Sequence, residues 1–487
     1  MKHRQRIVLL LISLGALEFC VHAAPNGVIF YNAVETYASP VTLRRVNPDG
    51  SGNQAVLVEL PEPSFPVVSR DGAKLLLTSG DPGRPFKISR NVFSLDLRTG
   101  GVARVTAFED IVRNGAGQTI IKTNGIAAAT NDTTFTSYTI HFPYHKAFAP
   151  DGRRVAVVDL PRTGGSTLSV SRTNAPTEQF LGSGRAPSLE VHDAGNPSPI
   201  GAAIYLGDPR TEANHGGDGV DWHPNREEVV GAFRSDIPVT GTAGIQGSEG
   251  TALFVFATDG RLNPFVRRLT SPSGVWDAFI DIFNLIQVSA NENDYAPEIS
   301  PDGTRVAYVR DTIRSDSRIS PFNLPALCTI RVINYDGTDD REILRLADGV
   351  LVTKLAWSPD GLELALDLSP QLFSQGAPLL SGDVTRSEIH VVRADGSNPH
   401  QLIPAPAAYP TWGPGPATRP VLRIRRDGDK LELQIDELVP GSLFVVEGSI
   451  DITNWESLGT FTAAGSTHFI TITPNPNAAF SFYRVRI

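Results

Sequence analysis

The stretch YAPEISPDGTRVAYVR, from Tyr295 to Arg310, contains a tight turn between two short apolar segments. The turn, Ser-Pro-Asp-Gly, occupies residues 300–303. Proline fixes φ near the value that the first central position of a turn needs, and glycine adopts the positive φ that other residues resist. Beyond the turn, Val306 and Tyr308 alternate with their neighbours as in a half-buried strand. The stretch therefore predicts a strand, a turn and a second strand.

This strand–turn–strand unit recurs along the chain. The other copies are FPVVSRDGAKLLLTS from Phe65, YHKAFAPDGRRVAVVD from Tyr144, GVDWHPNREEVVGAF from Gly219 and TKLAWSPDGLELALD from Thr353. A second hairpin that turns at Gly-Gly or Asp-Gly follows most copies, as in TIRVINYDGTDDREIL. Such self-similarity indicates a repeat protein, and two successive hairpins make the four-stranded antiparallel sheet of a β-propeller blade.

Two incomplete units lie at the ends of the repeat region. GVIFYNA and the hairpin after it lack a first strand, whereas AYPTWGPGP looks like a first strand with nothing after it. Together they complete a sixth blade if the strand around Tyr409–Trp412 pairs beside Gly27–Asn32. Such closure removes the open edges of the ring. The predicted fold is therefore an all-β, six-bladed β-propeller closed by its N- and C-terminal strands.

The third blade has two candidate outer hairpins. One is TLSVSRTNAPTEQFLG and the other is LEVHDAGNPSPIGAAIY. The sequence leaves this choice open, and the segment that is not used becomes an insertion.

The repeat resembles that of the TolB-type six-bladed propeller family of bacterial envelope proteins, which carries the same turn motif. Ser300–Gly303 and Trp357–Gly361 match it best, and Asp71-Gly72 and Asp151-Gly152 keep half of it. His223-Pro224-Asn225 has lost the Asp-Gly pair. The resemblance covers residues 26–416 and implies a propeller in a secreted or periplasmic protein.

A smaller module is expected after the linker PGPATRP. Residues 420–487 contain five or more short apolar segments, which fits a small β-sandwich of fibronectin or immunoglobulin style. The segment from Ser449 to the end resembles a C-terminal module common on secreted bacterial proteins. Trp455 and Tyr483 are its markers, and we expect both to fill its core.

The first residues read as a targeting segment. MKHRQR is basic, IVLLLISLGALEFCV is apolar, and Val21-His22-Ala23 offers small residues for cleavage. Residues 1–23 are therefore interpreted as a secretory signal peptide, and no later stretch is apolar enough to cross a membrane. We expect a secreted or periplasmic protein, placed in the cell envelope or outside it, with no integral membrane segment after cleavage.

Charge and cysteine content narrow the class of partner. The formal net charge of −9 argues against nucleic acid, which requires a basic surface. Cys328 is the only cysteine after the leader, and its apolar surroundings in LCTIRVI predict a buried side chain.

The connections between strands differ between the two faces of the predicted propeller. One face has only tight turns, whereas the other has long loops such as Phe108–Phe142 and Ser271–Asp294. Long loops in compact domains often carry function. Binding is therefore expected on the loop-rich face, around the central channel. The equivalent first residues of the inner strands lie at the channel rim there: Phe65, His145, Gly219, Ala296, Lys354 and Tyr409.

One long loop has apolar residues at helical spacing. In SGVWDAFIDIFNLI, from Ser273 to Ile286, Trp276 and Phe279 belong to an apolar stripe, and Ser273 is a plausible cap. The pattern predicts a helix that packs on the propeller or docks a partner. The predicted binding residues are Trp276, Phe279, Lys354 and Tyr409.

Catalytic candidates are few. His145 lies at the rim, and His215 and Asp218 lie in TEANHGGDGVDWHP from the next blade. If they meet in space, they form a carboxylate–imidazole site for acid–base chemistry or a metal. The scattered alternative, in which these are unrelated surface side chains, remains open. No nucleophile elbow, sialidase box or phosphate-binding loop is present.

Two function hypotheses result. The first is a binding scaffold that presents a loop-rich face to a protein, peptide or glycan. The second is a lyase or hydrolase that acts on polysaccharide at the channel mouth. No metal site or other cofactor is expected, although the sequence leaves open a calcium ion in the channel or in a loop.

Overall fold

The computed structural model describes most of the repeat region and parts of the C-terminal region. The described residues are 27–34, 41–84, 87–121, 135–159, 162–165, 188–193, 196–199, 204–205, 219–237, 239–240, 248–259, 265–281, 284–316, 323–374, 377–414, 421–427, 430–436, 443–449, 456–462, 468–472 and 482–486. Within them the chain is all-β apart from one short 3₁₀ helix, η2 (Val384–Arg386). None of the described helices is long and apolar enough to span a membrane. The predicted signal peptide lies outside these ranges.

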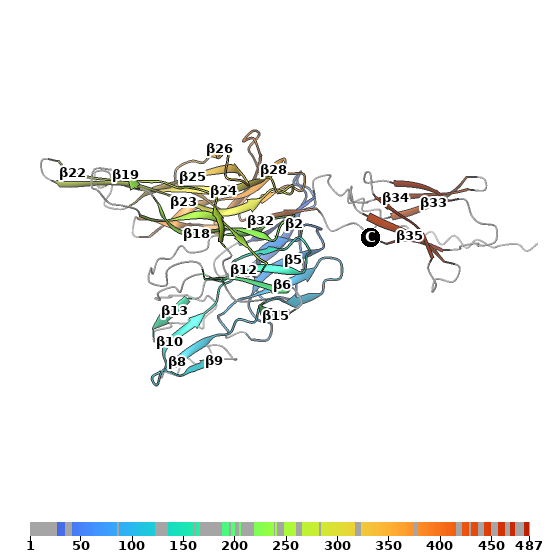
Figure 1. The fold of residues 1–487 in the computed structure, drawn as a ribbon, viewed down its shortest axis with the longest axis horizontal. Coiled ribbons are helices and arrows are strands. Elements are labelled where there is room, and N and C mark those ends of the chain that lie inside the picture. Colours follow the sequence, from blue (N-terminus) through green and yellow to red (C-terminus); the bar gives the residue numbers. More distant parts are fainter. Residues whose placement is uncertain are drawn as a thin grey trace, which may run out of the picture.

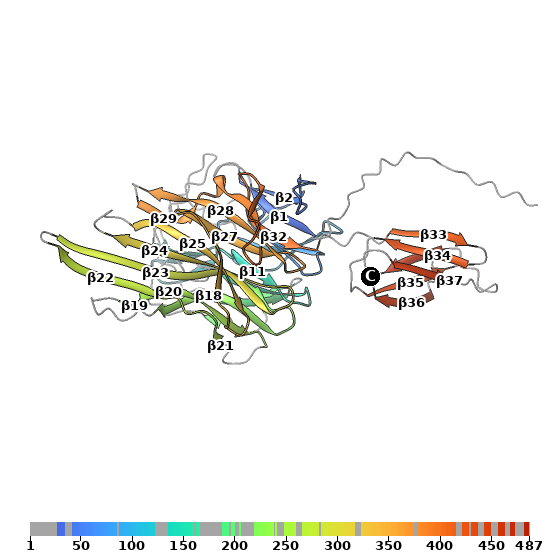
Figure 2. The ribbon, with the colours of Figure 1, turned by 90° about the horizontal axis from the view of Figure 1, so that it is seen from above.

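The fold is a β-propeller (Figures 1 and 2). Six sheets in the described part of the chain contain the four-strand antiparallel order that the repeat predicts. Each blade is named here by its innermost strand. The β32 blade contains β32 (Ala408–Gly413), β1 (Val28–Ala33), β2 (Thr42–Val46) and β3 (Gln54–Ala55). The β4 blade contains β4 (Ser64–Val68), β5 (Lys74–Ser79), β6 (Asn91–Asp96) and β7 (Val102–Arg104). The β11 blade contains β11 (His145–Phe148), β12 (Arg154–Asp159), β14 (Ser188–Asp193) and β15 (Asn196–Pro199), and β16 (Ile204–Tyr205) also pairs with β14.

The other three blades are longer. The β17 blade contains β17 (Val220–Trp222), β18 (Glu228–Ile237), β20 (Ser248–Ala257) and β21 (Phe265–Arg268). The β23 blade contains β23 (Asn284–Ile299), β24 (Arg305–Asp316), β25 (Asn323–Asn334) and β26 (Arg341–Arg345), and it is extended by β22 (Gly274–Asp281) and β19 (Val239–Thr240). The β27 blade contains β27 (Val350–Trp357), β28 (Glu363–Ser374), β30 (Glu388–Arg393) and β31 (His400–Ile403), and β29 (Ala377–Gly382) also pairs with β28. In Figure 2, β22, β23 and β24 run side by side as a long ribbon.

The innermost strands form a closed ring. Each contacts the next in the order β4, β11, β17, β23, β27, β32 and back to β4. The ring is completed by β1, which pairs antiparallel with β32 so that Ile29 faces Trp412 and Asn32 faces Ala408. The predicted pairing of Tyr409–Trp412 beside Gly27–Asn32 is therefore confirmed.

The tight turns repeat the same hydrogen bonds. Ser300 N–H binds the Arg305 carbonyl, Gly303 N–H binds the Ser300 carbonyl, and the Ser300 hydroxyl donates to Asp302 at 2.6 Å. Gly303 has a φ of +77°, as this turn requires. The motif that predicts the blades thus satisfies its own polar groups within the turn.

Apolar side chains of adjacent blades share their cores. One cluster joins Val309 and Cys328 of the β23 blade to Leu355 of the β27 blade, and all three are fully buried. The predicted burial of Cys328 is confirmed, and it raises the pKa of the thiol to about 12.

The structure settles two sequence-based alternatives. The third blade uses LEVHDAGNPSPIGAAIY, because β14 pairs with β12 and β15 pairs with β14. The helix predicted over Ser273–Ile286 is wrong, because residues 274–281 lie in β22 and residues 284–286 lie in β23. The ladder between β22 and β23 runs from Gly274↔Asn291 to Asp281↔Asn284, so sheet hydrogen bonding overrides the helical spacing there.

Part of the long Phe108–Phe142 connection forms a sheet of its own. It contains β8 (Ile111–Asn114), β9 (Thr119–Ile121), β10 (Phe135–Ile140) and β13 (Arg162–Gly165). Its order is β13-β10-β8-β9, so β13, which follows the inner hairpin of the β11 blade, returns to this added sheet.

The C-terminal strands form two sheets of three strands. They are β33 (Val421–Asp427), β34 (Lys430–Asp436) and β37 (His468–Ile472) in one, and β35 (Leu443–Ser449), β36 (Glu456–Thr462) and β38 (Phe482–Arg486) in the other. Both sheets contribute to one apolar cluster, which contains Leu433, Ile435, Val446 and the partly buried Tyr483. Trp455 lies outside the described residues.

Ring closure depends on a close approach that only glycine allows. A Cβ on Gly27 would lie 2.1 Å from the Gly413 carbonyl oxygen, and φ of Gly27 is +83°. Gly83 has a similar φ of +76°, but no atom lies within 4 Å of the place that a Cβ would take there. We expect Gly83→Ala to lower the free energy of unfolding by about 1 kcal/mol and Gly27→Ala by about 3 kcal/mol.

Urea unfolding of the two variants beside the wild type measures this difference. Equal losses would contradict the prediction, because they would mean that closure tolerates a side chain at the β1–β32 seam.

Candidate functional site

The rim of the channel is built from irregular backbone. Phe65, Ala296 and Tyr409 have φ values of +51°, +50° and +57°, and Gly219 has +141°. The register of the inner hairpin shifts at these points, for example between Ser64 and Val67. Such β-bulges re-aim the side chains at the end of a strand.

Polar side chains on three successive blades hold these bulges, and they are called the latches here. Asp367 accepts hydrogen bonds from the N–H groups of Lys354 and of Tyr409 in the next blade. Asn32 accepts from Phe65 N–H at 2.9 Å, and the Thr78 hydroxyl donates to the Pro143 carbonyl at 2.7 Å. The equivalent positions in the other three blades are apolar: Val158, Ala232 and Val309.

The latched half of the rim carries an arc of aromatic rings. The Phe65 ring lies 4.3 Å from the Tyr409 ring and 4.8 Å from the Tyr144 ring, centroid to centroid. Tyr144 also stacks on Phe142 at 5.5 Å. Phe65, Tyr144 and Tyr409 are half-buried, so this arc forms part of the surface at the loop-rich end of the channel.

Basic side chains lie beneath the arc. Lys146 is 2% exposed, and its Nζ donates to the Phe65 carbonyl at 2.6 Å and to the Thr78 hydroxyl at 2.9 Å. Burial, together with the charge of Lys354, holds the pKa of Lys146 well below its usual value. The same desolvation and the two lysines lower the pKa of His145 to about 3. His145 is therefore neutral at ordinary pH.

Lys354 forms an ion pair with Glu298 of the preceding blade. Burial lowers the pKa of Lys354 to about 8, against the opposing effect of the Asp221 and Asp367 carboxylates. Glu298 is held in turn through its backbone, because its carbonyl accepts a hydrogen bond from Trp357 Nε1 at 2.9 Å.

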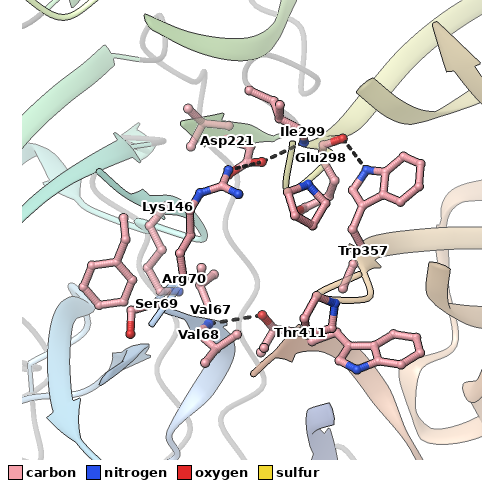
Figure 3. Close-up of a pocket in the computed structure, with 17 residues that line it drawn as sticks. Val67, Val68, Ser69, Arg70, Lys146, Asp221, Glu298, Ile299, Trp357 and Thr411 are labelled. Carbon is pink, nitrogen blue, oxygen red and sulfur yellow. Dashed lines mark hydrogen bonds and ion pairs between the residues drawn. The ribbon is translucent and has the colours of Figure 1, made fainter. Parts of the chain in front are cut away.

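A cavity of about 230 Å³ occupies the channel toward the tight-turn end (Figure 3). Its walls come from the inner strands and turns of all six blades, and they include Val67, Arg70, Phe148, Asp221, Glu298, Trp357 and Trp412. Apolar side chains form most of the wall, with charged groups at a few points. This composition is typical of small-ligand sites.

Arg70 is the exceptional residue of this cavity. The other five blades have proline at the same place in the turn: Pro150, Pro224, Pro301, Pro359 and Pro414. The Arg70 side chain crosses to the β17 blade, where Nη2 donates to the Trp222 carbonyl at 2.8 Å and lies 4.0 Å from Asp221 Oδ2.

Asp221 is fixed by backbone donors. Its Oδ2 accepts from Ile299 N–H of the next blade at 2.7 Å, and its Oδ1 accepts from Trp222 N–H at 2.8 Å. The carboxylate thus ties two blades together and supplies the negative charge that orients Arg70.

A histidine–aspartate pair lies outside the channel. His141 Nδ1 is 2.6 Å from Asp159 Oδ2, and the His141 ring stacks on Phe108 at 4.8 Å with an angle of 5°. The side chain of His141 is 16% exposed, whereas that of Asp159 is 3% exposed. A buried carboxylate of this kind fixes the tautomer and orientation of an imidazole.

The predicted site residues have different outcomes. His145, Lys354 and Tyr409 lie at the rim of the channel, whereas His215 and Asp218 fall outside the described residues. Their convergence with His145 stays a prediction. Trp276 and Phe279 lie in β22 rather than in a helix. No group of three or more His, Cys, Asp or Glu among the described side chains is placed to hold a metal ion.

Sequence reasoning missed Arg70 and Glu298, whereas Asp221 belongs to the segment TEANHGGDGVDWHP that it singled out for a carboxylate–imidazole site. The signal for Arg70 was present, because it is the one copy of the turn without proline before its Asp, Asn or Gly. Asp221 and Glu298 occupy the equivalent position two residues after the rim, where the other blades carry Val67, Ala147, Ala356 and Thr411.

No protein-family profile matches the chain, and no curated protein matches it. Similar solved structures include TolB from Acinetobacter baumannii, with 14% identity and a TM-score of 0.41 over 80% of this chain and 67% of that one. Another is an oligogalacturonate lyase in complex with manganese, with 11% identity and a TM-score of 0.32 over 84% of this chain and 93% of that one. A third is the propeller domain of the trilobed protease from Pyrococcus furiosus, with 11% identity and a TM-score of 0.32 over 92% of this chain and 94% of that one. These similarities are low, and the strand pairing of the chain itself shows the propeller.

The protonation of Lys354 tests whether burial or ion pairing dominates at the rim. With a pKa of about 8 when folded and 10.5 when unfolded, the unfolded chain binds more protons between these pH values. Stability relative to Lys354→Met should therefore rise by about 2 kcal/mol from pH 8 to pH 10.5. Unfolding free energies of both proteins across this range measure it. A difference that stays flat there and falls at higher pH would show that the Glu298 pair dominates.

Proposed function

We propose that this protein is a secreted or periplasmic binding propeller whose partner places a small group in the central channel. The partner is a protein, peptide or glycan. The observation that carries the proposal is the cavity of about 230 Å³ into which Arg70 projects. The fold alone does not require an arginine at this position, since proline makes the same turn in the other five blades.

The site proposed here lies at the tight-turn end of the channel. The loop-rich face was the expected location from the sequence, and it remains a second contact surface in this proposal. At the loop-rich end, the aromatic arc and the Lys354–Glu298 pair lie across the rim of the channel. A partner group therefore enters from the tight-turn end, and the loop-rich face is a separate contact surface at the opposite end of the channel.

The proposal includes the domain organisation and the location. Residues 1–23 are the signal peptide, residues 26–416 the propeller with six blades, and residues 420–487 a separate β-sandwich. In support, no sheet in the described residues combines strands of the two regions. The apolar cluster of the C-terminal strands also contains no propeller residue.

A polysaccharide-acting lyase or hydrolase is the second candidate function. The observation in its favour is the His141–Asp159 pair, because an imidazole oriented by a buried carboxylate suits general base chemistry. His145 does not suit a general acid, since its pKa of about 3 keeps it neutral. Turnover of a polysaccharide that falls at least about a hundredfold in His141→Ala would establish this second function.

Arg70→Pro is the decisive variant for the binding function. It installs the turn of the other blades: Arg70 sits at the first central position of a turn in which Gly72 N–H binds the Ser69 carbonyl at 2.9 Å. Proline is favoured at that position, so the fold should be retained. We expect the exported wild-type protein, immobilised and incubated with envelope and secretome extract of its source, to capture a partner at least about tenfold more strongly than Arg70→Pro.

A variant without residues 276–289, the outer part of the β22–β23 hairpin, separates the two faces. Bound protein and glycan are identified by mass spectrometry. Loss of capture only in the hairpin variant would move the site to the loop-rich face, and equal capture by all three proteins would contradict specific binding by either face. Glycan recovered in shortened form would favour the enzyme.

A further inference from the structure

We propose that the channel cavity binds an apolar, residue-sized group that ends in a single carboxylate, with Arg70 as its anchor. This inference rests on the proposed binding function and names the chemistry of the group that enters the channel. The carboxylate has two possible sources, the C-terminal residue of a peptide and a free monocarboxylic acid.

Arg70 retains the donors that such a group needs. A guanidinium has five N–H donors, and one of them binds the Trp222 carbonyl. None of the described residues accepts a hydrogen bond from the other four N–H groups of Arg70. The side chain is 30% exposed and lines the cavity, so these donors face the space that a ligand would fill.

The other charged groups around the cavity are already paired. Both Asp221 oxygens accept backbone hydrogen bonds, and Glu298 is paired with Lys354. Lys146 directs its Nζ to the Phe65 carbonyl and the Thr78 hydroxyl, away from the tight-turn end. Among the described lining residues, Arg70 is therefore the cation with hydrogen-bond donors left for a ligand, since it makes one hydrogen bond and lies 4.0 Å from Asp221.

The charge balance favours a monoanion over a dianion. Asp221 lies 4.0 Å from Arg70, so its negative charge already offsets part of the guanidinium charge. A carboxylate matches the planar fork of the guanidinium with two parallel hydrogen bonds. A phosphate brings nearly two negative charges toward Asp221, and the repulsion makes it the poorer ligand.

The size and walls of the cavity define the body of the ligand. A volume of about 230 Å³ is smaller than the sites of drug-sized ligands, so it fits one residue rather than a large molecule. Phe148, Ile299, Trp357 and Trp412 are at most 5% exposed and form apolar walls. An aromatic or branched aliphatic side chain suits these walls.

The test uses four probes on the full protein, measured by isothermal titration calorimetry. They are 3-phenylpropionate, the peptide Gly-Ser-Gly-Ser-Gly-Phe with a free carboxylate, the same peptide with a C-terminal amide, and phenyl phosphate. Wild type, Arg70→Pro and Arg70→Gln are compared, the last keeping the side-chain length without the charge. Thermal unfolding of the three proteins confirms that they share the fold.

We expect at least one of the two carboxylates to bind the wild type at least about tenfold more tightly than either variant, and the amide and the phosphate to bind more weakly than that carboxylate. Binding of the free acid alone assigns a small-molecule ligand, whereas binding of the peptide assigns a partner C-terminus. Equal affinity for peptide acid and amide, tighter binding of phenyl phosphate, or unchanged carboxylate affinity in both variants would overturn the inference. If none of the probes binds while Arg70→Pro still loses the captured partner, the inference fails and the binding function stands.

Discussion

The pairing of β1 with β32 is the constraint on which the rest of the structure depends. Each inner strand contacts the next one in the ring, so the blades at the two ends of the repeat region lack a neighbour on one side until the ring is closed. Closure joins residues 28–33 to residues 408–413, which lie at opposite ends of the repeat region. The core that contains Ile29 and Trp412, and the enclosure of the central channel on all sides, follow from this single seam.

The channel takes its chemistry from the positions at which the repeat is broken. Where the turn keeps its proline, the blade offers an apolar edge, as at Pro301 and Pro359. Arg70, Asp221 and Glu298 depart from the repeat and meet in one cavity. A symmetric scaffold thus becomes asymmetric through three side chains, because the ring brings together blades that are far apart in sequence.

Much of the fold was predictable because turn chemistry is local. The Ser-Pro-Asp-Gly motif satisfies its hydrogen bonds within six residues, so it can be recognised without knowledge of the neighbouring blades. The helix predicted around Trp276 failed for the opposite reason. Those residues continue the hydrogen-bond ladder of β23, which is set by distant partners in β24.

The candidate site was less predictable than the fold. Rim residues such as Lys354 and Tyr409 could be aligned by strand, but the sequence does not show which of them point at one another. The Lys354–Glu298 pair joins two blades and spans 56 positions of the chain. The Arg70 contact with Trp222 spans 152 positions. Such contacts depend on the twist and closure of the ring, which no local pattern encodes.

The latches give the ring two unequal arcs. Asp367, Asn32 and Thr78 lock the rims of three successive blades with buried hydrogen bonds, whereas Val158, Ala232 and Val309 offer only apolar contact. The other arc is joined by the cavity residues instead: Asp221 accepts a hydrogen bond from Ile299 N–H, and Trp357 Nε1 donates to the Glu298 carbonyl. Directional bonds between blades therefore come from the rim on one side of the ring and from the cavity wall on the other. The cavity wall thus has two tasks, because a change of Asp221 or Glu298 made to alter the channel also alters how the β17, β23 and β27 blades are held together.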